Sequence, residues 1–504
     1  MHGQRVLTQC LRTARGLCLQ HVSLPSQHTT ARFAGGCQEL SKLSTKVGLV
    51  QRRHAQEMAT GSEKLSEAEY LFVEDDQPCS TSSLTAGSTP AFLARKGVLN
   101  ARGQLMLKSL TYPDLEQWCI SIGERPQRAR QLWRWMYYDG GWVHSLDDTA
   151  DLQDGLSAAF REQWRDRITV DGGLRLRSVH TAADGTRKMV FDLQDSPEAA
   201  GAGVEAVIIP VERPGASRPR TTLCVSSQVG CAQNCQFCFT GRMGLRAQLS
   251  TAQIVEQVVE ARRHVAEHNR RVAAGELPGA APMAPISNIV FMGMGEPLHN
   301  FEAVGAALEV MCHPQGLRFS PNKVTVSTVG LVPQMRALAA RSAVQLAVSL
   351  HATTDEVRSW IVPLNRRYPL AELMGALEEL YPRNAALRPR AGRHVLFEYV
   401  MLRGVNDSLE DAERLIKLTA AIECKVNLIL FNPHAGTLFQ ASTQEQVLAF
   451  QAVLKAAGVV CTVRDSRGDD EMAACGQLGN IDELNRLAPM LKPPPRFRDA
   501  LVAA

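Results

Sequence analysis

The stretch Thr222-Leu-Cys-Val-Ser-Ser-Gln-Val-Gly-Cys231-Ala-Gln-Asn-Cys235-Gln-Phe-Cys238 runs from a candidate strand straight into three closely spaced cysteines. The cysteines have C-x3-C-x2-C spacing. Three thiolates in one loop can bind three irons of a cubic iron–sulfur cluster and leave the fourth iron open to another ligand. A zinc site would usually have a fourth cysteine or histidine at a matching spacing. The pattern therefore favours a cluster over a zinc site or chance clustering.

Strand-like and helix-like segments alternate from about residue 221 onward. Periodic helical stretches such as Ala252–Val272, Leu370–Leu380 and Thr443–Ala456 separate the strands. Sustained alternation of this kind predicts an α/β fold with a parallel sheet, wound into a full or partial βα barrel. The candidate strands are Thr222–Ser226, Asn288–Met292, Lys323–Ser327, Val344–Leu350, Val395–Val400, Lys425–Leu430 and Val459–Val463.

Four segments carry a family resemblance: Leu223-Cys-Val-Ser-Ser-Gln-Val-Gly-Cys231, Gly293-Met-Gly-Glu-Pro-Leu298, Ser349-Leu-His-Ala352, and Arg467-Gly-Asp-Asp with Ala473-Ala-Cys-Gly-Gln-Leu478. Together they resemble the RlmN family of radical S-adenosylmethionine (SAM) enzymes, which methylate C2 of adenosine in 23S rRNA and tRNA. The resemblance covers roughly residues 105–485. It implies a radical SAM partial (βα)6-type barrel with a small N-terminal α+β accessory domain. It also implies one [4Fe–4S] cluster and two SAM molecules per turnover.

The family motifs fall at the carboxyl ends of the candidate strands, where barrel active sites are assembled. Gly293–Pro297 follows the second strand, Ser327 ends the third and His351 follows the fourth. Asn432 follows the sixth strand, and Cys475 comes after the last. Chance placement would scatter these residues between both rims of the barrel. Their positions support the resemblance independently.

The resemblance assigns ligands to the cluster and contacts to SAM. The cluster ligands are Cys231, Cys235 and Cys238. Glycine allows close backbone approach, and a carboxylate after it can bind the ammonium group of an amino acid. Singly, each SAM contact could equally be a turn, cap or buried polar residue. The implied SAM contacts are Gly295, Glu296, Ser327, Ser349, Leu350, His351 and Asn432.

Two further cysteines, Cys224 and Cys475, match the reactive pair of the family. Cys475 lies in a glycine-flanked polar loop and Cys224 at a strand end, and either by itself could be a packing residue. The resemblance implies that one SAM methylates Cys475 and that a radical from a second SAM activates this methyl group. The activated carbon adds to adenine C2, which is too electron-poor to attack SAM directly. Cys224 then attacks the Cys475 sulfur and leaves a disulfide.

Glu205 matches the proton acceptor of the family. The segment between Pro210 and Cys224 is longer than the family pattern, and a loop insertion explains this without moving Glu205. The alternative is an exposed acid on a strand.

The remaining cysteines receive no catalytic role. Four are assigned to packing: Cys119, Cys312, Cys424 and Cys461. Four lie in the N-terminal extension and are given no specific role: Cys10, Cys18, Cys37 and Cys79.

The N-terminal segment predicts organellar targeting. Residues 1–38 contain no Asp or Glu and carry scattered Arg, Ser and Thr, a pattern typical of a transit peptide. We expect chloroplast localisation, with the mitochondrion as the alternative, or the cytoplasm if the segment is an arbitrary tail. The predicted organisation is a transit peptide and disordered linker (1–100), an accessory RNA-contacting domain (105–210), the radical SAM barrel (211–485) and a C-terminal tail (486–504).

The accessory domain is predicted to hold a basic helix, Pro126–Tyr138, and a hairpin around Asp184-Gly185. The hairpin strands are Leu174–Val179 and Lys188–Leu193, and Val204–Ile209 is a third strand. The helix carries Trp133, Trp135, Tyr137 and Tyr138. These aromatic side chains could contact nucleic acid or pack in a small core.

Composition alone does not identify the binding partners of the protein. The 504 residues carry 55 basic and 51 acidic side chains, so the net charge of +4 permits a local RNA-binding patch without arguing for one. No apolar run reaches the roughly 18 residues that a spanning helix needs, and 13 cysteines are too sparse for a disulfide scaffold. We expect a monomer that binds rRNA and also tRNA, takes electrons from ferredoxin or flavodoxin, and does not bind membranes. The alternatives are a C8-methylating relative of the Cfr type, a non-catalytic iron–sulfur RNA-binding protein and a zinc-ribbon module.

Overall fold

The computed structural model describes residues 91–138, 140–194, 203–211, 219–387, 393–479, 484–485 and 487–497. The predicted transit peptide, most of the predicted linker and the four cysteines of the extension lie outside the described residues. The long loop after Val211 also lies outside them.

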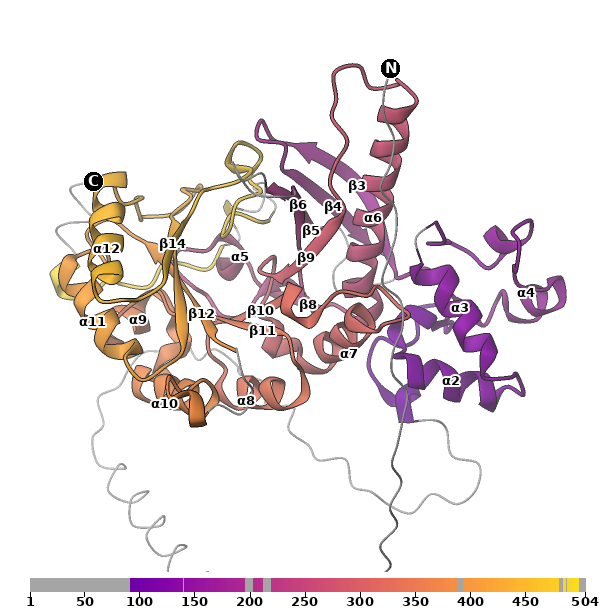
Figure 1. Ribbon diagram of the computed structural model, residues 1–504, viewed down its shortest axis with the longest axis horizontal. Coiled ribbons are helices and arrows are strands. Elements are labelled where there is room, and N and C mark those ends of the chain that lie inside the picture. The colour runs from indigo at the N-terminus through magenta and orange to yellow at the C-terminus, as the bar shows by residue number, and fades with distance from the viewer. Residues whose placement is uncertain are drawn as a thin grey trace, which may run out of the picture. The chain divides into compact units, whose positions relative to one another are not determined.

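The structure is organised by one ten-stranded sheet (Figure 1). Seven strands are parallel and form the predicted partial barrel, and β14 and β3 stand at the two ends of the strand order. The order along the sheet is β14 (Cys461–Arg464), β13 (Cys424–Leu430), β12 (Val395–Met401), β11 (Gln345–Ser349), β10 (Val324–Thr328), β9 (Ile286–Phe291), β6 (Arg220–Cys224), β5 (Gly203–Val211), β4 (Arg187–Leu193) and β3 (Leu174–Thr181). All seven candidate barrel strands are confirmed.

Helices connect the parallel strands, because a parallel pair needs a long crossover connection. Polar caps fix where several helices begin: Ser250 and Gln253 form a capping box on α6, and Thr443 caps α12. The connecting helices lie along the outer side of the parallel strands (Figure 1). They are α6 (Thr251–Ala273), α7 (Phe301–Cys312), α8 (Val332–Arg341), α9 (Asp355–Ile361), α10 (Leu370–Leu380), α11 (Leu409–Thr419) and α12 (Gln444–Ala456).

Two short strands that the sequence did not predict hold the cysteine loop. β7 (Gln228–Cys231) and β8 (Gly244–Gln248) form an antiparallel hairpin outside the main sheet. Gly230 has a φ of +72°, and a Cβ there would lie 1.9 Å from the carbonyl oxygen of Gly244. Only glycine fits this position, which turns the chain into the loop that carries the three cysteines.

The predicted hairpin and third strand of the accessory segment exist as β3, β4 and β5, but they do not form a separate sheet. β5 pairs with β6 in antiparallel register, with Val207 opposite Cys224, so the three strands extend the barrel sheet. The accessory segment was predicted as a separate small α+β unit, but its strands belong to the barrel sheet. Its helical part comprises α2 (Tyr112–Ser121), α3 (Gln127–Tyr137) and α4 (Ala158–Trp164), with a short parallel pair, β1 (Leu105–Met106) and β2 (Ile168–Thr169).

The aromatic residues on and just after helix α3 were predicted either to contact nucleic acid or to pack in a core. Trp133, Trp135 and Tyr137 are buried, and Trp133 packs edge-on against Tyr137 at 4.7 Å between ring centroids. Only Tyr138 of the four exposes a large part of its side chain. The aromatic residues of α3 therefore build the core, and its arginines face outward.

One continuous hydrophobic core underlies the sheet and α2–α4. A second, smaller core lies beneath the cysteine loop, where Trp360 of α9 stacks on Phe497 at 5.5 Å between centroids. Residues of the predicted C-terminal tail thus pack against the barrel. Among the described residues, no helix combines the length and apolar character needed to cross a lipid bilayer.

Candidate active site

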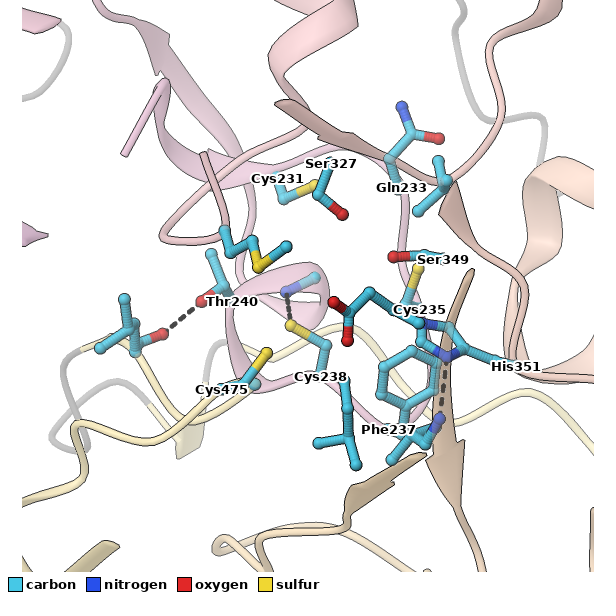
Figure 2. Close-up of a pocket in the computed structure, with 18 of the residues that line it drawn as sticks. Cys231, Gln233, Cys235, Phe237, Cys238, Thr240, Ser327, Ser349, His351 and Cys475 are labelled. Atoms are coloured by element: carbon cyan, nitrogen blue, oxygen red, sulfur yellow. Dashed lines mark hydrogen bonds between the residues drawn. The ribbon is translucent and has the colours of Figure 1, made fainter. Parts of the chain in front are cut away.

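The loop after β7 places Cys231, Cys235 and Cys238, here called the cluster cysteines, around one cavity of about 130 Å³ (Figure 2). Cys231 ends β7, and Cys238 caps the short helix α5 (Phe239–Arg242) by accepting a hydrogen bond from the Gly241 amide at 3.4 Å. Burial raises the pKa of all three thiols, that of Cys238 to about 11. A metal bound in the cavity would lower these pKa values, because positive charge stabilises thiolates.

The donor set of this cavity fits a multi-iron cluster. Three sulfur donors face a shared space. Cys238 contributes to the raised pKa of Cys231, and both Cys231 and Cys238 contribute to that of Cys235. Within the described ranges, no three His, Cys, Asp or Glu side chains converge as the ligands of a single metal ion would. A cubic cluster requires spread thiols instead, because each cysteine binds a different iron. All nine cysteines of the described ranges are free thiols.

Glu296 supplies a buried carboxylate to the same cavity. One of its oxygens accepts a hydrogen bond from the Leu298 amide at 3.0 Å, and the other accepts one from Val329 at 2.9 Å. Within the described part of the chain it has no cationic partner, and burial raises its pKa to about 7. Gly295 has a φ of +98°, and a Cβ there would lie 2.5 Å from Gln228. The glycine thus lets the turn pack tightly enough to aim Glu296 inward.

Ser327, Ser349 and His351 line the cavity from the ends of β10 and β11 (Figure 2). His351 is buried with a φ of +59°, a conformation uncommon outside glycine and typical of functional positions. Its Nδ1 accepts a hydrogen bond from the Val400 amide at 3.1 Å, so the ring proton is on Nε2. Burial and then Arg358 lower the pKa of His351 to about 3. The ring is therefore a neutral donor.

The Leu350 side chain does not belong to the cavity lining. It lies in the hydrophobic core, and its backbone oxygen accepts a hydrogen bond from Arg358 Nε at 3.0 Å. Arg358 is fully buried and also donates to the carbonyl oxygens of Val329 and Ser349. It fastens the ends of β10 and β11 together behind the cavity. No local pattern distinguishes Arg358 from an ordinary charged helix residue.

Cys475 connects the first cavity to a second one of about 20 Å³, which is also lined by Cys224. Cys475 is an exposed residue, because it faces the open cavity, yet the surrounding groups desolvate its thiol and raise its pKa. Burial raises the pKa of Cys224 to about 12, and the charge of Arg464 opposes the rise at both thiols. The structure thus brings together two cysteines 251 positions apart in sequence, since 475 − 224 = 251.

Asn432 and Glu205 hold the loop that carries Cys475. Asn432 lines both cavities, and its Nδ2 donates to the Cys475 carbonyl oxygen at 3.2 Å. Glu205 does not belong to the lining of either cavity. Its carboxylate accepts a hydrogen bond from the Gly479 amide at 3.0 Å and lies 3.8 Å from Lys188 Nζ.

Several lining residues escaped the sequence analysis. Gln233, Phe237 and Thr240 lie between or just after the cluster cysteines, so position alone could have suggested them (Figure 2). Glu398 and Arg464 lie on β12 and β14, and alternation within a buried strand gives no signal for their roles. A charged residue in an otherwise apolar parallel strand is the one available hint.

Two family models match the chain. The Radical SAM superfamily model matches residues 225–418, and the model of the ribosomal RNA large subunit methyltransferase N-terminal domain matches residues 105–165. The dual-specificity RNA methyltransferase RlmN of Syntrophobacter fumaroxidans is 45% identical, covering 74% of this chain and 97% of the relative. The protein of the same name from Geotalea uraniireducens is 44% identical, covering 75% and 97%. A crystal structure of a radical SAM methyltransferase from Sphaerobacter thermophilus has a TM-score of 0.62 and 38% identity, covering 74% of this chain and 98% of that one.

Proposed function

Because the chain belongs to the RlmN family of radical SAM RNA methyltransferases, we propose that it methylates C2 of adenosine in 23S rRNA, and in tRNA as well, with Cys475 as the carrier of the methyl group. The observation that carries this proposal is the shared lining of the two cavities. Cys475 faces the cluster cysteines on one side and Cys224 on the other. Neither a packing cysteine nor a zinc ligand requires this arrangement.

The cluster cysteines would hold a [4Fe–4S] cluster, which together with SAM supplies the radical that removes hydrogen from a methyl group. Glu296 would bind the SAM ammonium group, because its buried carboxylate has no cationic partner among the described residues and a positively charged ligand would stabilise it. The neutral His351 donates a hydrogen bond, and the hydroxyl groups of Ser327 and Ser349 orient the ligand. Gly295 and Asn432 complete the contacts, whereas Leu350 acts indirectly, because its carbonyl oxygen is bound by Arg358 and holds the end of β11 in place.

Cys475 carries the methyl group and forms a bond to adenine C2 through the methyl carbon. The radical adduct would return one electron to the cluster, and Glu205 accepts the proton that leaves C2. Cys224 then attacks the Cys475 sulfur and forms a disulfide with it. The bond between that sulfur and the transferred carbon breaks, its electron pair stays on the carbon, and a proton taken up there completes the methyl group of the released base. The disulfide requires the two Cα atoms within roughly 7 Å at that step, and both residues already line one small cavity. Two SAM molecules are consumed in each turnover, one to load Cys475 and one to activate its methyl group.

The partners follow from this chemistry. The RNA substrate binds over the cavity mouth, and a low-potential electron donor such as ferredoxin or flavodoxin supplies the reducing electron. We propose that the protein acts as a monomer in a chloroplast, or in a mitochondrion, where bacterial-type ribosomes provide the substrate.

Mass spectrometry of nucleosides tests the proposal directly. Anaerobically reconstituted protein is incubated with SAM, a reductant and unmodified 23S rRNA or tRNA, with Cys475→Ala as the matched control. We expect 2-methyladenosine from the wild-type protein and none from the control. Formation of 8-methyladenosine would identify a C8-methylating enzyme, and absence of both products would leave a non-catalytic RNA-binding protein.

A further inference from the structure

Lys188 and Glu205 form a nearly buried ion pair beside the active site. Their side chains are only 11% and 9% exposed, and Nζ of Lys188 lies 3.8 Å from Oε1 of Glu205. The pairing register explains the contact: β4 and β5 are antiparallel, Glu205 lies opposite Val190, and Lys188 lies opposite Val207. The two charged residues are therefore diagonal neighbours on one face of the sheet.

The pair holds both ends of the segment that carries Cys475. Lys188 donates from Nζ to the carbonyl oxygen of Met472 at 3.5 Å, three residues before Cys475. Glu205 accepts a hydrogen bond from the amide of Gly479 at 3.0 Å, four residues after it. One ion pair thus spans the loop whose thiol is proposed to carry the methyl group.

The turn between β3 and β4 holds the start of the same loop. The amide of Ala183 donates to Asp470 at 2.8 Å, and the amide of Gly468 donates to Asp184 at 3.2 Å. A Cβ at Gly468 would lie 2.8 Å from the Thr186 side chain, which shows how closely the two segments pack. The Cys475 loop therefore packs on the β3–β4–β5 extension of the sheet. Among the residues of this extension that contact the loop, Lys188 is the cation that pairs with Glu205.

We propose that Lys188 is a positioning residue for the methyl transfer: its ammonium group pairs with the proton acceptor Glu205, and its hydrogen bond fixes the loop that presents Cys475. The inference rests on the proposed function, since it takes the roles of Glu205 and Cys475 from there. Lys188 itself touches neither substrate nor cluster.

The electrostatics agree with the geometry. Burial raises the pKa of Glu205, while Lys188 and then the Gly479 amide lower it. Among the described residues, Lys188 is the only charged side chain found to act on this carboxylate. Loss of the lysine charge should therefore raise the pKa of Glu205 further. More of the carboxyl groups would then be protonated at neutral pH and unable to accept a proton.

The test compares Lys188→Met and Lys188→Arg with Lys425→Met, a matched loss of charge at an exposed position of β13. The rate of 2-methyladenosine formation is measured against pH in reconstituted protein that already carries the methyl group. In Lys188→Met we expect the acidic limb of the pH–rate profile to move to higher pH and the rate at neutral pH to fall. Lys188→Arg should keep the wild-type limb, and Lys425→Met should match the wild type.

A second readout does not depend on turnover. Brief alkylation of reconstituted protein that has not been exposed to SAM and so carries no methyl group, followed by peptide mass spectrometry, reports how freely the Cys475 thiol reacts. We expect faster alkylation of Cys475 in Lys188→Met than in Lys188→Arg or the wild type. If Lys188→Met does not fold, Lys188→Gln takes its place, because glutamine removes the charge with less loss of polarity.

The outcomes separate the inference from the proposed function. Wild-type pH dependence together with wild-type alkylation in Lys188→Met would overturn the role of Lys188 and leave the methyltransferase intact. A lower rate without a shifted limb, not restored by Lys188→Arg, would also overturn it, because that result indicates a packing role. Absence of 2-methyladenosine from the wild-type protein would overturn the proposed function and the inference with it.

Discussion

Replacing Arg358 with methionine should destabilise the edge of the sheet on which the active site is built. Arg358 is 1% exposed and donates four hydrogen bonds: to the carbonyl oxygens of Leu350, Val329 and Ser349, and to the side chain of Asn365 at 2.9 Å. Methionine fills much of the space but leaves three acceptors without that donor, namely the carbonyl oxygens of Val329 and Ser349 and the side-chain oxygen of Asn365. The Leu350 carbonyl oxygen keeps a hydrogen bond from the Ala352 amide at 2.8 Å. At about 1 kcal/mol for each unpaired acceptor, the free energy of unfolding should fall by about 3 kcal/mol.

Thermal unfolding followed by circular dichroism measures this effect. At about 2 °C per kcal/mol for a protein of this size, the midpoint should fall by about 6 °C. Arg341→Met is the matched control, because Arg341 is half-exposed and pairs with Glu302 at 3.3 Å and Glu309 at 3.9 Å. Exposed pairs contribute roughly 0–1 kcal/mol, so its midpoint should move by about 2 °C at most. A loss in Arg358→Met no larger than in the control would refute the reasoning.

Four further outcomes are expected. Replacing any one cluster cysteine with alanine should abolish iron binding in anaerobically reconstituted protein, and a full iron complement in all three single variants would contradict the ligand assignment. Cys475→Ala should bind iron and SAM but form neither methylated protein nor product. Cys224→Ala should instead stall as a covalent protein–RNA adduct through Cys475, detectable by peptide mass spectrometry; normal turnover without an adduct would show that Cys224 is structural. Residues 1–90 fused to a fluorescent protein should direct it to a plastid or mitochondrion, since their first 38 residues lack acidic side chains, and diffuse cytosolic fluorescence would argue against targeting.

The barrel was accessible to sequence reasoning because its signals are local. A strand buried on both faces leaves a short apolar run, and an amphipathic helix leaves a repeating apolar face. Helix α10 has the predicted bounds, Leu370–Leu380, and Thr443, predicted as the first residue of α12, proves to be its N-cap. The cysteine loop was equally visible, since all three thiols lie within eight residues of one another.

The contacts that position the site were not accessible, because they join residues distant in the chain. Arg358 reaches back to Val329, and Lys188 reaches forward to Met472. Neither residue stands out from its local sequence pattern. Arg358 lies in helix α9, where a charged residue is ordinary, and Lys188 lies in β4, a strand with alternating polarity. The β7–β8 hairpin was missed for a different reason. Its strands are short and enclose the cysteine loop, so the metal-binding pattern masks the strand pattern.

The direction of β5 explains how a segment that precedes the barrel can contribute to its active edge. The parallel strands all present their carboxyl ends to the cavity, and Cys224 ends the first of them, β6. Because β5 runs antiparallel to β6, its beginning lies beside the end of β6: Val207 is opposite Cys224, and Glu205 lies two residues beyond it. A parallel β5 would have carried Glu205 to the opposite rim. The antiparallel extension is therefore what places the proposed proton acceptor and its lysine next to the Cys475 loop. The predicted domain boundary near residue 210 therefore separates two stretches of the sequence that both contribute to one site.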